Sequence, residues 1–146
     1  LNDHEIAVLG AYDFGPVRIG LVYEYKKWDV AAGGDINNNM YGISGTIPAG
    51  PGKIFAYWGE VSNGKGSAVD GQTLGVASGP VKGPDTSAQQ WEVSYTYPLS
   101  KRTQVYAGYV KYNNKNNATY TFNINPYAVA PGGDPQGLVM GMIHFF

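Results

Sequence analysis

Two short patterns in this chain begin like ligand-binding loops, but each lacks residues that the chemistry requires. The run Gly59-x4-Gly64-Lys65 starts like a phosphate-binding loop, yet Gly66 stands where a Ser or Thr would bind Mg²⁺. The run Asp35-x-Asn37-x-Asn39 starts like a calcium loop, yet Met40 replaces the turn glycine and Thr46 replaces the bidentate glutamate. Neither pattern therefore predicts a phosphate or calcium site.

Other residues with catalytic or metal-binding chemistry are sparse. The chain has two histidines, His4 and His144, which are too far apart in sequence to suggest a metal pair. It has no cysteine, which excludes a disulfide framework and thiolate metal centres. No arrangement of Ser, His and Asp is recognisable. We therefore expect no enzymatic activity, no cofactor and no bound metal.

Five charged residues are the strongest functional candidates, because each belongs to a segment with strand character. They are Arg18, Glu24, Lys26, Glu92 and Lys111. Apolar and polar side chains that alternate every second residue predict strands with one apolar and one polar face. On a polar face that lines water, such charges act on passing ions through a screened field. The solvated face of a soluble sheet has the same pattern, so alternation alone leaves both interpretations open.

Seven segments with strand character follow one another, with no helix predicted between them. The predicted strands are 4–14, 17–27, 40–48, 53–61, 89–97, 103–113 and 136–146. Segment 89–97 alternates most cleanly, with Trp91 and Val93 on one side and Glu92 on the other. The facing of 53–61 and 103–113 stays open. Residues 118–124 are a possible further short strand.

The composition agrees with an all-β protein. The 146 residues include 21 Gly and 12 Tyr, and only 14% are charged, as expected for many short strands joined by turns. Mean hydropathy is −0.25, and no apolar run reaches the roughly 18 residues of a membrane-spanning helix. A barrel strand whose side chains face lipid and water in alternation has a near-neutral mean hydropathy, so this value does not exclude a membrane barrel. The net charge of −1 does not indicate a nucleic-acid partner.

The predicted connections alternate in length. Those at 15–16, 48–52 and 98–102 are short, whereas those at 29–39, 62–88 and 114–135 are longer. Membrane barrels have short periplasmic turns and long extracellular loops, so this alternation favours a transmembrane barrel over a soluble sandwich. If the last strand runs towards the periplasm, counting back places residue 1 outside. Bacterial single-chain barrels have even strand numbers, so we expect residues 1–146 to be the carboxy-terminal part of one larger barrel domain.

The last ten residues form a strand pattern that ends on an aromatic residue. This ending resembles the carboxy-terminal assembly signal of Gram-negative outer-membrane proteins. Gly141-Met-Ile-His144-Phe-Phe146 is similar to the ending of β-proteobacterial general porins, although Ile143 stands where that family often has a basic residue. Segments 12–18 and 95–107 also resemble porin hairpins.

The resemblance implies an antiparallel transmembrane β-barrel of sixteen strands, of which this chain supplies about the last seven. It implies a trimer in the outer membrane of a Gram-negative bacterium that passes ions and small hydrophilic solutes by passive diffusion. Lipid, lipopolysaccharide and the barrel-assembly machinery are the implied partners. Gly141, His144 and Phe146 would form the assembly signal, and the five charged residues would line the pore. No segment is identifiable as an inward-folded constriction loop.

A second interpretation is a small eight-stranded barrel, soluble or in the outer membrane, that binds a ligand or supports adhesion. It gains weight if 118–124 is a full membrane-spanning strand. Pore size, ion selectivity and preferred solute are not predicted.

Overall fold

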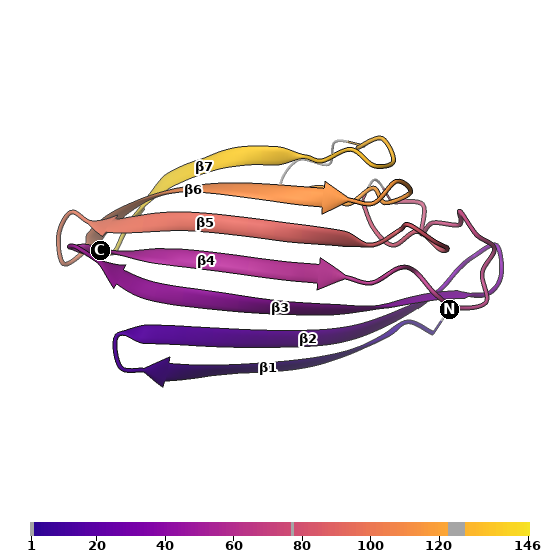
Figure 1. Cartoon of the computed structure of the whole chain (residues 1–146), viewed down its shortest axis with the longest axis horizontal. Helices are drawn as coiled ribbons and strands as arrows, with labels where there is room; N and C mark the ends of the chain where they lie inside the picture. The colour runs from indigo at the N-terminus through magenta and orange to yellow at the C-terminus, as the bar shows by residue number, and fades with distance from the viewer. Residues whose placement is uncertain (1, 77, 123–127) are drawn as a thin grey trace.

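The computed structural model describes residues 2–76, 78–122 and 128–146, and its strands form one antiparallel sheet (Figure 1). Seven strands pair with their sequence neighbours in the order β1 to β7. They are β1 His4–Phe14, β2 Val17–Asp29, β3 Asp35–Ala49, β4 Gly52–Val61, β5 Ala88–Pro98, β6 Thr103–Asn114 and β7 Gln136–His144. The predicted all-β antiparallel sheet is confirmed. Among the described residues, no helix has the length and apolar character needed to cross a membrane.

Short and longer connections alternate along the chain, as predicted. Short turns lie at 15–16, 50–51 and 99–102, and longer connections occupy 30–34, 62–87 and 115–135. Gly15 at φ 75° and Gly50 at φ 58° allow the first two turns. In the third turn, Ser100 Oγ accepts hydrogen bonds from the amides of Arg102 and Thr103 at 3.2 and 3.0 Å. Figure 1 shows the short turns at one end of the sheet, which we call the short-turn end, and the longer connections at the opposite, long-connection end.

The two ends of the chain lie at opposite ends of the sheet. In Figure 1 the amino terminus is beside the longer connections and the carboxy terminus is beside the short turns. This arrangement agrees with the strand directions expected from the connection lengths.

One face of the sheet, which we call the polar face, carries mainly small and polar side chains. Ser44, Tyr57 and Glu92 are direct neighbours on it, because Ser44 pairs with Tyr57 and Tyr57 pairs with Glu92. The Tyr57 ring covers Gly42, where an added Cβ would lie 2.6 Å from the Tyr57 hydroxyl. Tyr106 covers Gly141 in the same way, at 2.5 Å. These tyrosines fill the space that glycine leaves on a curved sheet.

On the opposite face, which we call the apolar face, large hydrophobic side chains are exposed, and none of the described connections covers them. Ile43, Trp58 and Trp91 are direct neighbours on it. Trp91 is 49% exposed, and Leu138 on β7 is 79% exposed. A soluble sandwich would bury this face against a second sheet. A bare apolar face of this extent requires an apolar environment or a partner.

The buried side chains gather at the long-connection end instead of between two layers. The buried hydrophobic residues are Val30, Ile36, Ala68, Val81, Ala88 and Ala118. Ile36, with 0% exposure, packs with Val30, Ala68 and Leu74. The hydrophobic core therefore joins the start of β3 to the long connection 62–87.

The strand β3 begins at Asp35, earlier than predicted, and this corrects the expectation of a loop over 29–39. Asn and Asp favour turns in isolation. Here Asn37 pairs with Lys27 of β2, and its backbone also exchanges two 2.8 Å hydrogen bonds with Lys65. Pairing on both sides overrides the local preference, so the segment is extended.

The possible short strand at 118–124 is not supported by the described part of that segment. Residues 118–122 are not in a strand, and 123 and 124 lie outside the described residues. The last strand ends at His144, two residues earlier than predicted.

Candidate functional site

Four of the five charged candidates lie on the polar face, and one does not. Arg18, Glu24 and Lys26 occupy alternate positions of β2 on the side of Ser44, and Glu92 is beside Tyr57. These positions are the ones predicted.

Lys111 lies on the apolar face, so the expectation that it shares one face of the sheet with the other four is wrong. It pairs with Trp91, while Val110 pairs with Glu92. The sequence of β6 did not reveal this facing, because apolar and aromatic residues occur on both of its sides. Only the pairing with β5 decides which side Lys111 takes. Lys111 also pairs with Gln136, the first residue of β7, so it sits towards the long-connection end.

Two cations of the polar face, Lys26 and Arg18, are paired with carboxylates, whereas Lys53 on β4 is in no ion pair among the described residues. Lys26 Nζ lies 2.5 Å from Glu24 Oε2 and 3.7 Å from Glu5 Oε1. Arg18 Nη1 lies 3.6 Å from Asp13 Oδ2, and both side chains are largely exposed. An exposed pair contributes little to stability, about 0–1 kcal/mol. The Arg18–Asp13 pair therefore matters more for the local field than for the fold.

Glu92 differs from the carboxylates that pair with Lys26 and Arg18. It makes no ion pair with any residue that the structure describes. Its neighbours across the sheet are the aromatic Tyr57 and the aliphatic Val110. This carboxylate therefore projects an uncompensated negative charge near the middle of the polar face.

The three residues of the predicted assembly signal lie at or near the carboxy-terminal end of the sheet. Gly141 is on the polar face beneath Tyr106. His144 Nδ1 is 2.8 Å from Thr103 Oγ1, and its ring meets that of Phe146 edge-on with centroids 5.0 Å apart. Phe146 is fully exposed. Its position leaves the ring free for an external partner, and its role in assembly stays a prediction.

The long connection 62–87 folds over the polar face, which the sequence analysis did not anticipate. Its base is closed by Thr86, whose Oγ1 accepts a hydrogen bond from Gly64 N at 2.9 Å and donates one to Gly83 O at 2.7 Å. Further along, Leu74 packs against the cluster around Ile36, a polar-face position of β3. No such segment was identifiable from the sequence, and the structure shows that 62–87 packs onto the polar face.

The described residues of a second connection, 115–135, form hydrogen bonds with the connection 62–87 and so help to hold it in place. Asn117 N donates to Asp85 O at 2.8 Å, and Thr121 N donates to Ser78 Oγ at 3.1 Å. Asn38 Nδ2 donates to the Tyr120 hydroxyl at 3.2 Å. Burial raises the pKa of Tyr120 to about 12, although the Asn38 hydrogen bond opposes the shift. Tyr120 is therefore neutral at physiological pH.

A cavity of about 420 Å³ lies between these connections and the polar face. The aromatic residues that line it are Trp28, Tyr57, Tyr112 and Tyr120. Amide groups of Asn38 and Gln90 and the ammonium group of Lys26 also line it. Such a mixture of rings and a few polar groups is typical of ligand pockets. The sequence provided little indication of this cavity, because these residues come from six separated segments.

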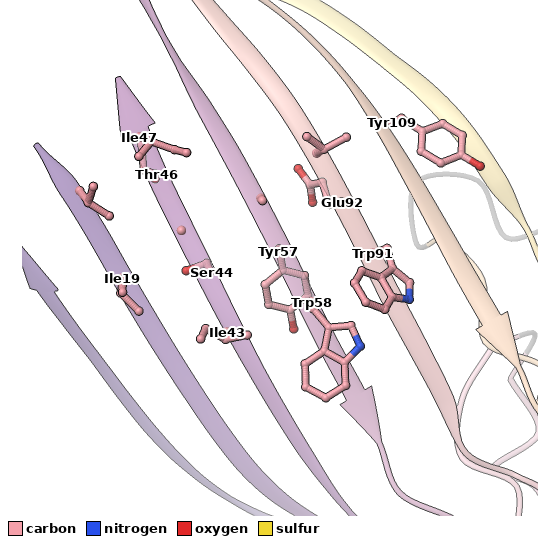
Figure 2. Close-up of a pocket in the computed structure, with 14 residues that line it drawn as sticks. Ile19, Ile43, Ser44, Thr46, Ile47, Tyr57, Trp58, Trp91, Glu92 and Tyr109 are labelled. Carbon is pink, nitrogen blue, oxygen red and sulfur yellow. The ribbon is translucent and has the colours of Figure 1, made fainter. Parts of the chain in front are cut away.

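A shallow groove of about 550 Å³ marks the apolar face (Figure 2). The paired small residues Gly45 and Ala56 form its floor, and Ile43 and Trp58 are among the larger residues that line it. The rings of Trp58 and Trp91 lie side by side, with centroids 6.2 Å apart. Most of the side chains that line the groove from the apolar face are aliphatic or aromatic, so the groove suits hydrocarbon.

No group of three or more His, Cys, Asp or Glu side chains that could hold a metal ion occurs within residues 2–76, 78–122 and 128–146. The charged and aromatic residues of the polar face therefore remain the candidate functional groups.

Comparison with known proteins identifies the family. The family model for Gram-negative porin matches residues 2–117. Outer membrane porin protein 32 of Delftia acidovorans is 29% identical over 149 residues, which cover 99% of this chain and 38% of that protein. The solved anion-selective porin from Comamonas acidovorans has a TM-score of 0.76 and 25% identity, over 97% of this chain and 39% of that one.

The chain thus spans about two fifths of the length of these two relatives. The matched sheet includes both the polar and the apolar face described above, and the predicted family resemblance is confirmed. This chain belongs to the Gram-negative porin family.

Proposed function

We propose that this chain forms part of the wall of a water-filled outer-membrane channel, through which ions and small hydrophilic solutes diffuse passively. One observation carries the proposal: a single sheet has a bare apolar face and an opposite polar face, in a member of the porin family. Lipid acyl chains cover the apolar face, and water fills the space beside the polar face. We infer that the protein is a channel and not an enzyme.

The polar-face charges line the lumen in this proposal. Arg18, Glu24, Lys26 and Glu92 face passing solutes, whereas Lys111 faces the membrane near the long-connection end. A lysine at that level extends its flexible stem so that the amine reaches the polar headgroups. Lys111 therefore anchors the wall at the membrane surface and does not set selectivity.

We infer further that residues 1–146 are the carboxy-terminal part of a sixteen-stranded barrel that assembles as a trimer. This chain matches only 38% and 39% of the length of its two relatives, which supports the inference that it is part of a larger barrel.

The sign of the ion selectivity does not carry over from the relative named as anion-selective. In this chain Lys26 and Arg18 are paired with carboxylates. Neither Lys53 nor Glu92, which both lie on the polar face, is in an ion pair among the described residues, and their opposite charges offset each other in the overall balance. The described part of the polar face therefore offers little net attraction for anions.

The full-length porin that contains this chain, reconstituted in a planar lipid bilayer, provides the test. We expect stepwise conductance that rises in proportion to bulk salt, because a water-filled pore conducts without tight binding. A heat-denatured preparation is the control. A correctly folded protein that produces no conductance steps would overturn the proposal.

The assembly signal has its own test in the same full-length protein. Lipopolysaccharide, outer-membrane lipid and the barrel-assembly machinery are the proposed partners. Removal of Phe146, whose ring is fully exposed, should sharply lower the yield of assembled protein in the outer membrane. Phe145→Ala, on the other face of the strand end, is the matched control. An unchanged yield after the deletion would contradict the assembly role.

The second interpretation, a small eight-stranded barrel with a ligand-binding or adhesion role, is not favoured. It needs a further strand, and residues 118–122 do not form one.

A further inference from the structure

The cavity over the polar face is small and enclosed on one side by the connection 62–87. Its volume of about 420 Å³ is near the lower end of the range for ligand pockets, about 300–1,000 Å³. It lies on the face that lines the lumen in the proposed channel. A solute that crosses the channel on this side therefore meets the cavity.

Aromatic rings from three strands and one connection surround the cavity. Trp28 comes from β2, Tyr57 from β4, Tyr112 from β6, and Tyr120 from the connection 115–135. All four rings are partly buried, so each is held in place by its surroundings. Tyr112 is packed edge-on against Phe122, with ring centroids 5.3 Å apart. Positioned aromatic rings give flat apolar contact area at a low entropic cost.

Neutral hydrogen-bonding groups lie among these rings. Asn38 is 3% exposed, and it orients Tyr120 by donating its amide hydrogen to the phenol oxygen. Gln90 lies next to Trp91 in β5 but points to the other face, towards the cavity. An amide side chain offers both donor and acceptor atoms to a hydroxyl group.

The charge at the cavity argues against an anionic ligand. Among the described residues that line the cavity, Lys26 carries the positive charge. Its Nζ lies 2.5 Å from Glu24 Oε2 and 3.7 Å from Glu5 Oε1. The two carboxylates more than cancel its charge. An anion that approached Lys26 would be repelled by Glu24 and Glu5.

We infer that this cavity is a weak binding subsite for neutral, hydroxyl-rich ring solutes of the sugar class. The carbon–hydrogen faces of such a ring pack on the aromatic side chains, and its hydroxyl groups hydrogen-bond with the amides of Gln90 and Asn38. This inference rests on the proposed channel function and deepens it, because it names a class of solute that the channel retains during passage.

The test uses the full-length porin in planar bilayers, with glucose and maltose as neutral probes and malate as an anionic probe. We expect each sugar to reduce the ion current reversibly and in a saturable manner. Tyr112→Ala should weaken this effect about tenfold, since that factor corresponds to about 1.4 kcal/mol, within reach of one lost ring contact. Tyr109→Ala, on the opposite face of the same strand, is the matched control and should leave the sugar effect unchanged.

Gln90→Leu provides a second variant that keeps side-chain size and does not remove a packed ring. It should also weaken the sugar effect, measured relative to the variant's own conductance without sugar. Conducting channels that no sugar affects, or that malate blocks more strongly than sugar, would overturn the inference and leave the channel function intact. An absence of conductance in the wild type would instead contradict the channel function.

Discussion

The short-turn end and the long-connection end of this sheet are held by interactions of very different range. At the short-turn end, each connection is closed by nearby residues, such as Gly15 at positive φ and Ser100 beside Thr103. At the long-connection end, Asn38 bonds Tyr120 across 82 positions of sequence, and Thr86 bonds Gly64 across 22. The comparison indicates that local sequence patterns specify the strands, which form the wall. Long-range packing specifies the cover over the polar face, which consists of the connection 62–87 and the described part of 115–135.

This difference has a functional meaning in the proposed channel. A wall needs only strands whose successive side chains face lipid and water in turn. A cover over the lumen must hold particular side chains in place, and it does so with buried residues such as Ile36 and Thr86. Changes at the long-connection end should therefore alter what passes, whereas changes at the wall should alter whether the protein assembles. All the variants below are made in the full-length porin.

The largest expected effect comes from Ile36→Ala, which removes a fully buried side chain beneath the connection 62–87. Truncation of a buried isoleucine costs about 2–5 kcal/mol. We expect faster proteolysis within 62–87 and a lower unfolding midpoint in urea. Ile47→Ala in the same strand, near the short-turn end and 45% exposed, is the matched control. Equal losses from both variants would refute a cover held by buried contacts.

The next effect concerns the wall. Val93→Arg places a charge on the apolar face of β5 and should cost about 2–4 kcal/mol if the site lies near the membrane midplane. We expect a strong decrease in membrane-assembled protein. Glu92→Arg, one residue earlier on the polar face, should assemble normally. If the two variants assembled equally well, the assignment of the faces would be wrong.

A smaller effect is expected from Thr86→Val, which keeps the shape of the side chain and removes its hydroxyl. Gly64 N and Gly83 O then lose their hydrogen-bond partner, which costs about 1–3 kcal/mol for buried groups. Hydrogen exchange at the Gly64 amide should accelerate. Thr73→Val, at an exposed position of the same connection, should change little. Unchanged protection at Gly64 would show that other contacts close the base.

The smallest effect is electrostatic. The double variant Arg18→Glu, Lys26→Glu replaces two cations of the polar face and should shift the reversal potential towards cation preference. The shift should be moderate and largest at low salt, because the Debye length is about 8 Å at physiological ionic strength. Lys111→Glu makes the same kind of change on the apolar face and should shift selectivity much less. A comparable shift from Lys111→Glu would place that residue in the lumen after all.

Much of the wall could be predicted from the sequence, because strand alternation is a local property. In β5, the residues on either side of Glu92 are apolar, and a period of two assigns them to one face without knowledge of any neighbour. The alternation of short and longer connections likewise predicted the direction of each strand. Turn residues such as Gly15 and Ser100 marked where the short connections would form.

The facing of β6 could not be obtained locally. Tyr106 and Val110 lie on one side, Val105 and Tyr109 on the other, so both sides of the strand have similar character. Only the pairing of Lys111 with Trp91 places that lysine on the apolar face. A register shift of one residue would have moved it to the lumen.

The amino-terminal part of β3 and the cover over the polar face were likewise decided by tertiary structure. Residues 35–39 carry three asparagines, which favour a loop in isolation, but hydrogen bonds to Lys65 and pairing with β2 extend them as a strand. The sequence by itself determined a sheet with two chemically different faces, because alternation needs no distant partner. The inward fold of the connection 62–87 and the cavity beneath it required contacts between residues far apart in the chain, which no local pattern specifies.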